Sequence, residues 1–536
     1  MIIKDDLFQT GNREKVWDKY CGFLDLSLPD FMEIQEQMLE KQLDIVRTSK
    51  LAGKFMPYHP GNIAEFRDAV PLTTYDDYAG FLMEKNEDAL AVKPYCWARS
   101  TGRCGCKKWV PYTERAIEMF GIVGVASMIL ACANNRGEVN IGSKVKMLLN
   151  LPPAPYVIGL LADIMVPCLD ARVIAPAIGY AEDDYESKLQ AGFATAMRTG
   201  VDVLSCLATM LITTGDRLVE NPGVMSFGWK ALYPHVMWRL MKAWVSSRRE
   251  GRAILPRDLW PLEGLCCYGI GGCVYREKLK YYWGRDPLQS YGSAETGMIA
   301  INAWNKKHLT FMPSSCFLEF IPEGEWLRGR ENPRYKPQTV LFDEVEPGRR
   351  YELVITSFHG MPFLRYRMGD LIKVMALEDR EAGIRLPQVD FETRIADIID
   401  IAGSTRLDEE TIWKAIANTG VKYEDWSARA ETEDGRDVLR LYIELKSETA
   451  LGELNRGIRR ELKALARDYI DAEDGQDIPP LHLYPVSRGS FRRYYEEKRK
   501  EGADLAWLRP PHMNAPDDVI SQLVRISQGS KAEINA

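Results

Sequence analysis

The most constraining feature of this sequence is a change in its apolar pattern along the chain. Within Phe120–Ala253, apolar stretches such as Ala154–Ala162 and Val201–Ile212 are separated by proline, glycine and charged turns. The pattern there predicts strands of about five residues alternating with helices of about ten or more, as in an α/β region. From Phe317 onward the runs become short and β-rich. The predicted strands are 317–321, 339–342, 351–356 and 371–374.

A new α+β pattern begins after about residue 390, and we place a domain boundary at Gln388–Phe391. The sequence therefore predicts a large domain of residues 1–390 and a small one of residues 391–536. In the small domain we expect strands at 395–401 and 439–444, and helices at 409–418 and 454–469. The charged run 492–500 is expected to be a solvated helix face, and a specific anion site is the alternative.

Near the N-terminus, apolar spacing predicts one amphipathic helix from Leu28 to Lys54, with Gln42 as the polar break in its stripe. The segment Phe66–Tyr78 is expected to be a loop and then a helix start, with threonine and aspartate caps.

Charge and apolar content exclude several classes of protein. The chain has 536 residues and a formal net charge of -7, with a pI near 5.7, which argues against nucleic acid as a partner. The N-terminus has acidic residues and no apolar leader, and the run 120–133 is shorter than the ~20 residues of a spanning helix. We therefore expect a cytoplasmic protein that does not associate with a membrane.

The eleven cysteines do not form a secreted disulfide pattern, and none occurs after Cys316. Six scattered histidines give no zinc spacing. We expect a reducing compartment and no metal site built from cysteines.

Three segments concentrate groups that could carry chemistry. Ser100–Pro111 combines hydroxyls, glycines and lysines, as a phosphate cradle requires, although an ordinary glycine turn fits equally well. Leu288–Gly297 offers an aromatic ring, a tight turn and a carboxylate for Mg²⁺; the alternative is a strand, turn and helix with a capping Glu295. Phe363–Asp370 ends in a carboxylate that could accept two ribose hydroxyls, or Asp370 could be structural in a glycine turn.

The order and spacing of these segments, followed by Thr393–Asp397, resemble the acyl-adenylate-forming superfamily. Within it the chain is similar to bacterial members of the auxin-responsive acyl acid amido synthetase family, relatives of plant enzymes that conjugate jasmonate or auxin to amino acids. The resemblance runs from about Leu28 to Pro511. Further matches are Val70–Tyr78, Phe317–Pro322, Gly502-Ala503 and Pro510-Pro511.

The resemblance implies an α/β fold. It comprises a large N-terminal adenylate-forming domain, with mixed sheets layered with helices and a small β-rich subdomain, and a smaller mobile α+β C-terminal domain. It also implies ATP-dependent activation of a small carboxylic acid as an acyl-adenylate, followed by transfer to an amine such as an amino acid. ATP and Mg²⁺ are the expected cofactors.

The resemblance also implies the site residues. The ATP phosphates would be held by Ser100, Thr101, Gly102, Gly105 and Lys108, and the adenine would lie against Gly271, Gly272, Cys273 and the turn Tyr291, Gly292, Ser293, Ala294. Glu295 would bind Mg²⁺, Asp370 the ribose hydroxyls, and Arg394 the ribose or phosphate. The expected catalytic residues are Arg509, Lys108 and Glu295.

Some positions depart from the family pattern. Arg103 and Cys104 replace hydroxyl residues in the phosphate loop, Arg509 stands where the family has a catalytic lysine, and Ala396 stands where the superfamily often has a hinge aspartate. Arginine and lysine differ in geometry and hydration. Either Arg509 suffices, or Arg103 or Lys107 compensates, or the protein no longer adenylates.

Two alternative functions stay open. One is an acyl-CoA ligase of the phenylacetate type, with CoA as acceptor, and the other is a catalytically impaired protein that binds nucleotide or acid. The apolar segment Met197–Ile212 is expected either to line the acyl pocket or to be a plain core helix.

Overall fold

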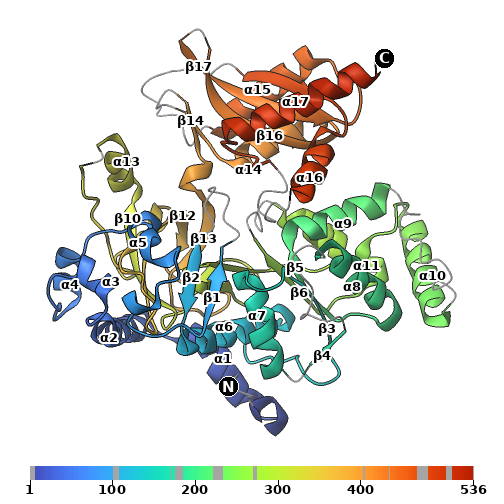
Figure 1. Ribbon diagram of the computed structural model, residues 1–536. Coiled ribbons are helices and arrows are strands. Elements are labelled where there is room, and N and C mark those ends of the chain that lie inside the picture. Colours follow the sequence, from blue (N-terminus) through green and yellow to red (C-terminus); the bar gives the residue numbers. More distant parts are fainter. Residues whose placement is uncertain are drawn as a thin grey trace. The chain divides into compact units, whose positions relative to one another are not determined.

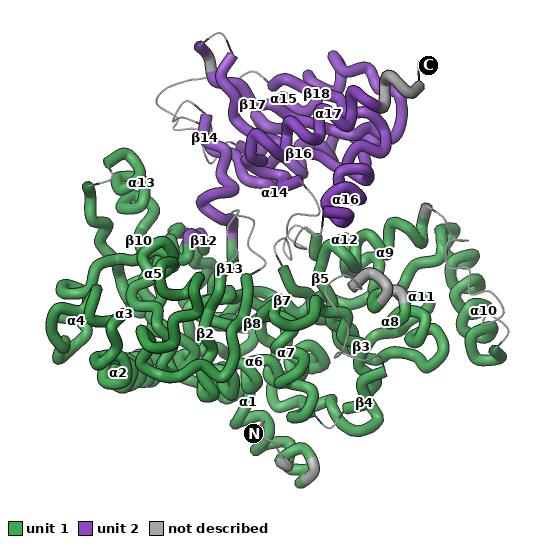
Figure 2. The backbone as a smooth tube through the Cα atoms, viewed as in Figure 1, with its two compact units in different colours: residues 1–100, 107–368, 372–391 green, residues 101–106, 369–371, 392–536 purple. Residues whose placement is uncertain are grey.

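The computed structural model describes residues 6–534 except 101–107, 170, 175–184, 221–232, 270–274, 333, 402–404, 434, 467–480 and 502–509. The chain divides into two compact units (Figures 1 and 2). The first contains residues 1–100, 107–368 and 372–391. The second contains residues 101–106, 369–371 and 392–536.

An 11-stranded mixed sheet forms the framework of the large unit, in the order β10-β11-β12-β13-β9-β8-β7-β6-β5-β3-β4. Strands β4, β3, β5, β6 and β7 pair in parallel, whereas β7–β8, β8–β9, β9–β13 and β10–β11 pair antiparallel. The strands are β3 (Lys146–Asn150), β4 (Arg172–Val173), β5 (Val203–Leu207), β6 (Gly264–Tyr268), β7 (Leu288–Ser293), β8 (Gly297–Asn302), β9 (Leu309–Phe311), β10 (Cys316–Pro322), β11 (Arg350–Ser357), β12 (Tyr366–Ala376) and β13 (Gln388–Arg394). The mixed α/β class predicted from the sequence is confirmed.

Helices and one separate hairpin complete this unit. The hairpin pairs β1 (Cys96–Arg99) with β2 (Trp109–Tyr112). The helices are α1 (Arg13–Cys21), α2 (Leu28–Val46), α3 (Lys50–Phe55), α4 (Ile63–Ala69), α5 (Tyr75–Leu82), α6 (Glu114–Cys132), α7 (Val157–Met165), α8 (Tyr185–Thr199), α9 (Ala208–Glu220), α10 (Pro234–Arg249), α11 (Pro256–Leu259), α12 (Arg276–Trp283) and α13 (Glu323–Glu331).

Helix α6 is the central helix of the large core. By length and composition it could cross a membrane, but 78% of its apolar stretch is buried inside the protein. It packs closely on α7, since a Cβ atom at Gly124 would lie 2.5 Å from Leu161 Cδ1. This burial is that of a core helix.

The small unit is an α+β structure built on a three-stranded sheet. Strands β16 and β17 pair antiparallel, and β17 and β18 pair in parallel. Its elements are β14 (Ile399–Ile401), β15 (Thr405–Leu407), α14 (Glu409–Asn418), β16 (Tyr423–Glu433), β17 (Arg436–Leu445), α15 (Leu451–Leu465), β18 (Leu481–Val486), α16 (Ser490–Lys500) and α17 (Asp517–Ile534).

Most of the predicted elements are confirmed, including helix 409–418 and the strands near 317–321, 351–356 and 439–444. The predicted strand 339–342 is wrong, because only an isolated bridge joins Val340 to Phe320. The single helix 28–54 is also wrong, since Ser49 accepts a hydrogen bond from Ala52 N and caps a new helix, α3.

Three further segments differ from the sequence-based expectation. Residues 63–69 form α4 rather than a loop, although the predicted cap of the next helix is confirmed because Thr74 N donates to Asp77 Oδ2 at 2.8 Å. Residues 395–397 form a 3-10 turn before β14. Residues 197–212 are not one core helix; they contain the end of α8, all of β5 and the start of α9.

A histidine between two carboxylates holds the segment that precedes α17 in the small unit. His512 Nδ1 lies 2.5 Å from Glu409 Oε1, and His512 Nε2 lies 2.8 Å from Asp425 Oδ1. Its ring stacks on Trp426 with centroids 4.5 Å apart. Burial opposes the charged form, but Glu409 and Asp425 outweigh it and raise the pKa of His512 to about 10. Both ring nitrogens therefore donate to carboxylates at neutral pH.

We predict that His512→Gln destabilises the small unit in a pH-dependent manner. The pKa of His512 is raised above its unfolded value of about 6.5. Its stabilisation is therefore complete below pH ~6.5 and is lost as the pH rises toward about 10. Urea unfolding across this range should show a loss of roughly 2–4 kcal/mol at low pH that shrinks as the pH rises.

The control is His482→Gln, because His482 forms a half-exposed pair with Glu433 in the same unit. Exposed pairs contribute little, so this variant should match the parent. A pH-independent loss in His512→Gln would contradict the ion-pair assignment.

Candidate active site

A tight turn between β7 and β8 presents the carboxylate of Glu295. A Cβ atom at Gly292 would lie 2.0 Å from the Gly297 carbonyl oxygen, so only glycine fits there. Ser293 Oγ accepts from Glu295 N at 3.1 Å and Ser293 N donates to Thr296 Oγ1 at 3.2 Å. The segment is thus a strand, turn and strand, and the alternative of a helix capped by Glu295 is wrong.

The Glu295 side chain is only 8% exposed and needs partners for its charge. Tyr366, the first residue of β12, donates its hydroxyl to Glu295 Oε1 at 2.6 Å. Lys108, which immediately precedes β2, places Nζ 3.6 Å from the same oxygen and donates to the Tyr366 hydroxyl at 3.3 Å. Burial, and then the Glu295 charge, raises the pKa of Tyr366 far above its ordinary value. The Tyr366 hydroxyl therefore stays protonated and donates.

Glu295, Tyr366 and Lys108 form what we call the carboxylate triad. Among the described residues, no side chain or backbone group contacts Glu295 Oε2 by a hydrogen bond or ion pair. One oxygen is thus fixed by the protein and the other can face a ligand. A lone carboxylate suits Mg²⁺, which usually keeps several waters and takes oxygens from substrate phosphates. In the described part of the chain no group of three His, Cys, Asp or Glu side chains could hold a metal by itself.

The structure brings together a second pair of predicted residues, in the small unit. Asp370 on β12 is 6% exposed. Its Oδ1 lies 3.6 Å from Arg394 Nε at the end of β13. Opposite charges at this distance attract and fix the two side chains.

Two further predicted residues each precede a member of the carboxylate triad in the sequence: Tyr291 precedes Glu295, and Ser100 precedes Lys108. Tyr291 is 7% exposed on β7, and its ring stacks on Phe391 with centroids 5.7 Å apart. Ser100 N donates to the Lys108 carbonyl at 3.2 Å at the base of the β1–β2 hairpin. The Ser100 hydroxyl is buried and has no hydrogen-bond partner among the described residues.

Several predicted positions lie outside the described residues. They are Thr101, Gly102, Gly105, Gly271, Gly272, Cys273 and Arg509, together with Arg103 and Cys104, which depart from the family pattern.

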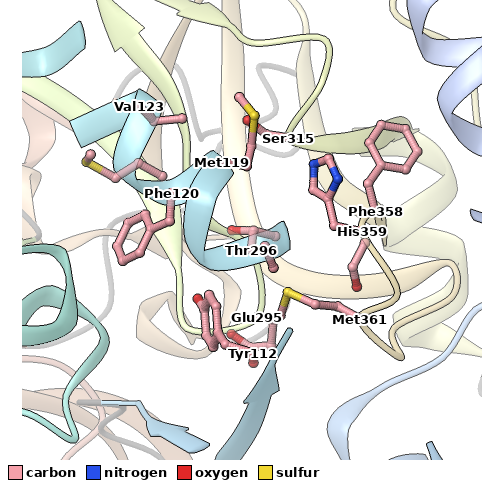
Figure 3. A pocket seen from close by; sticks show the side chains of 13 residues that line it. Tyr112, Met119, Phe120, Val123, Glu295, Thr296, Ser315, Phe358, His359 and Met361 are labelled. Atoms are coloured by element: carbon pink, nitrogen blue, oxygen red, sulfur yellow. The ribbon is translucent and has the colours of Figure 1, made fainter. Parts of the chain in front are cut away.

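A pocket lies beside Glu295 and Thr296 (Figure 3). The pocket is lined mostly by apolar side chains. These are Tyr112, Ala116, Met119, Phe120, Val123, Met298, Phe358 and Met361, and the other polar lining residues are Ser315, Ser357 and His359. Tyr112 also donates to the Ala294 carbonyl at 2.7 Å and so ties the pocket to the turn.

Sequence reasoning missed these lining residues. They come from β2, α6, β8, the turn before β10, the end of β11 and the turn after it, which lie far apart in the sequence. Turn signals exist at Pro313–Ser315 and His359-Gly360, but nothing in the sequence places the two turns together. No lining residue comes from 197–212, the segment expected either to form part of the acyl pocket or to be a core helix.

The fold of the chain is similar to the folds of two solved ligases. It superposes on "AtGH3.15 acyl acid amido synthetase in complex with 2,4-DB" with a TM-score of 0.69 and 17% identity, covering 96% of each chain. It superposes on 2-hydroxyisobutyryl-CoA ligase, solved in the postadenylation state with R3-HIB-AMP, with a TM-score of 0.61 and 13% identity. That match covers 93% of this chain and 91% of the other.

Sequence comparison adds a match to a family model and to curated relatives. Residues 309–394 match the GH3 family central domain. An indole-3-acetic acid-amido synthetase, GH3.3, of Arabidopsis thaliana is 26% identical over 277 residues, which are 47% of this chain and 44% of the relative. A jasmonoyl–L-amino acid synthetase, JAR4, of Nicotiana attenuata is 27% identical over 46% of this chain and 43% of its own length. The family model thus matches one segment of the chain, and the chain spans about half the length of the curated relatives it matches.

We predict that Tyr366→Phe lowers the free energy of unfolding by about 1–3 kcal/mol, because a buried carboxylate oxygen loses its hydroxyl donor. Urea unfolding measures this loss. The matched control is Tyr335→Phe, since Tyr335 donates to Glu325 Oε2 at 2.7 Å in a hydrogen bond that is only partly buried. Water can replace that hydroxyl, so the control should lose under about 1 kcal/mol. Equal losses in the two variants would contradict the role of Tyr366 in the triad.

Proposed function

We propose that this protein activates a small carboxylic acid with ATP and transfers the acyl group to an amine, as an acyl acid amido synthetase. The carboxylate triad carries this proposal, because it joins a buried carboxylate, a lysine and a tyrosine beside an apolar pocket. The GH3 family domain and relatives named as indole-3-acetic acid-amido and jasmonoyl–L-amino acid synthetases support it. An amino acid is the acceptor that these names favour.

In the first half-reaction the substrate carboxylate oxygen forms a bond to the α-phosphorus of ATP, and the bond from that phosphorus to pyrophosphate breaks. Lys108 is positioned to offset the negative charge that gathers on the phosphate oxygens. When bound, Mg²⁺ supplies further charge stabilisation, and Glu295 Oε2 would hold it. Asp370 would accept the ribose hydroxyls, with Arg394 beside it.

In the second half-reaction the amine nitrogen forms a bond to the acyl carbon, the bond to the AMP oxygen breaks, and the amine releases a proton. We propose that residues 1–390 bind ATP and the acyl group and that residues 391–536 are a mobile lid. Ser100, Thr101, Gly102, Gly105 and Gly271–Cys273 would contact the nucleotide. Tyr291 would lie against its adenine, and Arg509 would supply the positive charge that the family takes from lysine.

The acyl group is proposed to occupy the pocket lined by α6 and the turn after β11. Glu295 and Thr296 form part of that pocket, so an acid bound there lies next to the carboxylate triad. The apolar wall excludes water, which would protect an acyl-adenylate from hydrolysis.

We predict that Glu295→Gln and Asp370→Asn each lower ATP–pyrophosphate exchange by at least about 100-fold, because each removes a charge at the proposed nucleotide site. Exchange is measured with a broad panel of acids, with folding checked by circular dichroism. The control Glu346→Gln changes an exposed carboxylate and should keep full activity.

Product analysis with amines or CoA separates the remaining functions. Amide without thioester supports the proposed function, and thioester without amide would replace it with an acyl-CoA ligase. Nucleotide binding without exchange for any acid would replace it with a binding protein.

A further inference from the structure

Two polar side chains lie on the side of the pocket away from the carboxylate triad. Figure 3 shows Glu295 and Tyr112 on one side of the pocket and Ser315 and His359 on the other. Between them the wall consists largely of methionine and aromatic side chains. Methionine is flexible, so this wall can adapt to the body of a ligand.

Ser315 has a hydroxyl without a partner. The residue is 9% exposed, and its Oγ is buried with no hydrogen bond to any described residue. A buried hydroxyl left unpaired costs about 1–3 kcal/mol. A ligand atom that hydrogen-bonds to Ser315 Oγ would recover this free energy.

His359 lines the same pocket and has a ring nitrogen that can accept a hydrogen bond. Its Nε2 lies 2.9 Å from the Ser314 carbonyl oxygen, which can only accept, so Nε2 carries the hydrogen. Burial lowers the pKa of His359, so the ring is neutral at pH ~7. In the described part of the chain no group hydrogen-bonds to Nδ1, whose lone pair is available to a ligand.

Helix α2 fixes the turns that carry these two residues. Gln35 donates to the carbonyls of Pro313 and Cys316, on either side of Ser315. Gln42 donates to the Met361 carbonyl and accepts from Gly360 N, both at 2.8 Å.

His359 itself has a φ of 62°, a left-handed conformation uncommon outside glycine. Thr113 Oγ1 donates to its carbonyl at 2.7 Å. These buried hydrogen bonds hold Ser315 and His359 in place before any ligand binds.

We propose that Ser315 and His359 recognise a hydroxyl group on the acid, remote from its carboxyl group. A hydroxyl can accept a hydrogen bond from Ser315 Oγ and donate one to His359 Nδ1 at the same time. A methyl or halogen substituent cannot form this pair of hydrogen bonds. The substrate class is thus an apolar carboxylic acid with a distal hydroxyl. This inference rests on the proposed function, since it takes the pocket as the acyl site.

The experiment compares matched acids with and without the hydroxyl, using benzoate, phenylpropanoate and hexanoate with their para-hydroxy or terminally hydroxylated derivatives. We expect kcat/KM in ATP–pyrophosphate exchange to favour the hydroxy acid in at least one pair by about tenfold or more, because the acid that lacks it leaves buried polar groups unpaired. Ser315→Ala and His359→Asn should each reduce this preference at least about threefold, measured as the ratio of kcat/KM for the two acids of a pair. Asparagine tolerates the left-handed backbone at residue 359.

The control is Ser314→Ala, because the Ser314 hydroxyl contacts only the Met119 sulfur, at 3.7 Å, among the hydrogen bonds of described residues. It should keep the parent preference. Equal kcat/KM within every pair of acids, or a preference that survives in Ser315→Ala and His359→Asn, would overturn the inference. Ser315 Oγ and His359 Nδ1 would then bind water rather than the substrate.

Titration calorimetry with the same acids separates the two proposals. If no acid supports exchange, the proposed function fails. Tighter binding of the hydroxy acid by the parent, lost in Ser315→Ala, would still support the recognition site, whereas equal binding would overturn it.

Discussion

The arrangement of the candidate site depends on the cost of burying one carboxylate. Glu295 is almost fully removed from solvent, and a buried charge without partners would be prohibitive. Tyr366 and Lys108 supply these partners from two other segments, so the β7–β8 turn, the start of β12 and the residue before β2 are tied to one point. The same contacts leave the second carboxylate oxygen to a ligand.

The large sheet explains how distant segments reach this point. Its parallel half ends in β7, and β7 pairs antiparallel with β8, so the chain must turn tightly where the parallel pairing ends. The pocket wall is assembled around this turn from α6 and the turns that flank β10 and β11. Helix α2, which contributes nothing to the pocket lining, holds both turns through Gln35 and Gln42. Gln42, the polar residue within the apolar stripe of α2, therefore fixes the turn after β11.

Much of the fold was predictable because local patterns agree with it. Regular apolar spacing and clear turns located β10, β11, β17 and α14. The failures have local causes: Ser49 caps a second helix within one apolar stripe, and residues 339–342 have strand composition but a single bridging partner. The apolar run 197–212 contains a strand between two helices. The sequence did not reveal it, because buried strands and buried helices have similar compositions.

The sequence by itself determined the fold class, an order of motifs that resembles the acyl acid amido synthetase family, and the acidic and polar residues that the proposed chemistry needs. Such features are contiguous or regularly spaced, so one chain suffices to read them. Only the tertiary structure decided that Tyr366 and Lys108 partner Glu295, that Asp370 meets Arg394, and that Ser315 and His359 share a pocket. Those pairings join residues far apart in the chain, and the packing of sheet and helices rather than sequence spacing sets their distances.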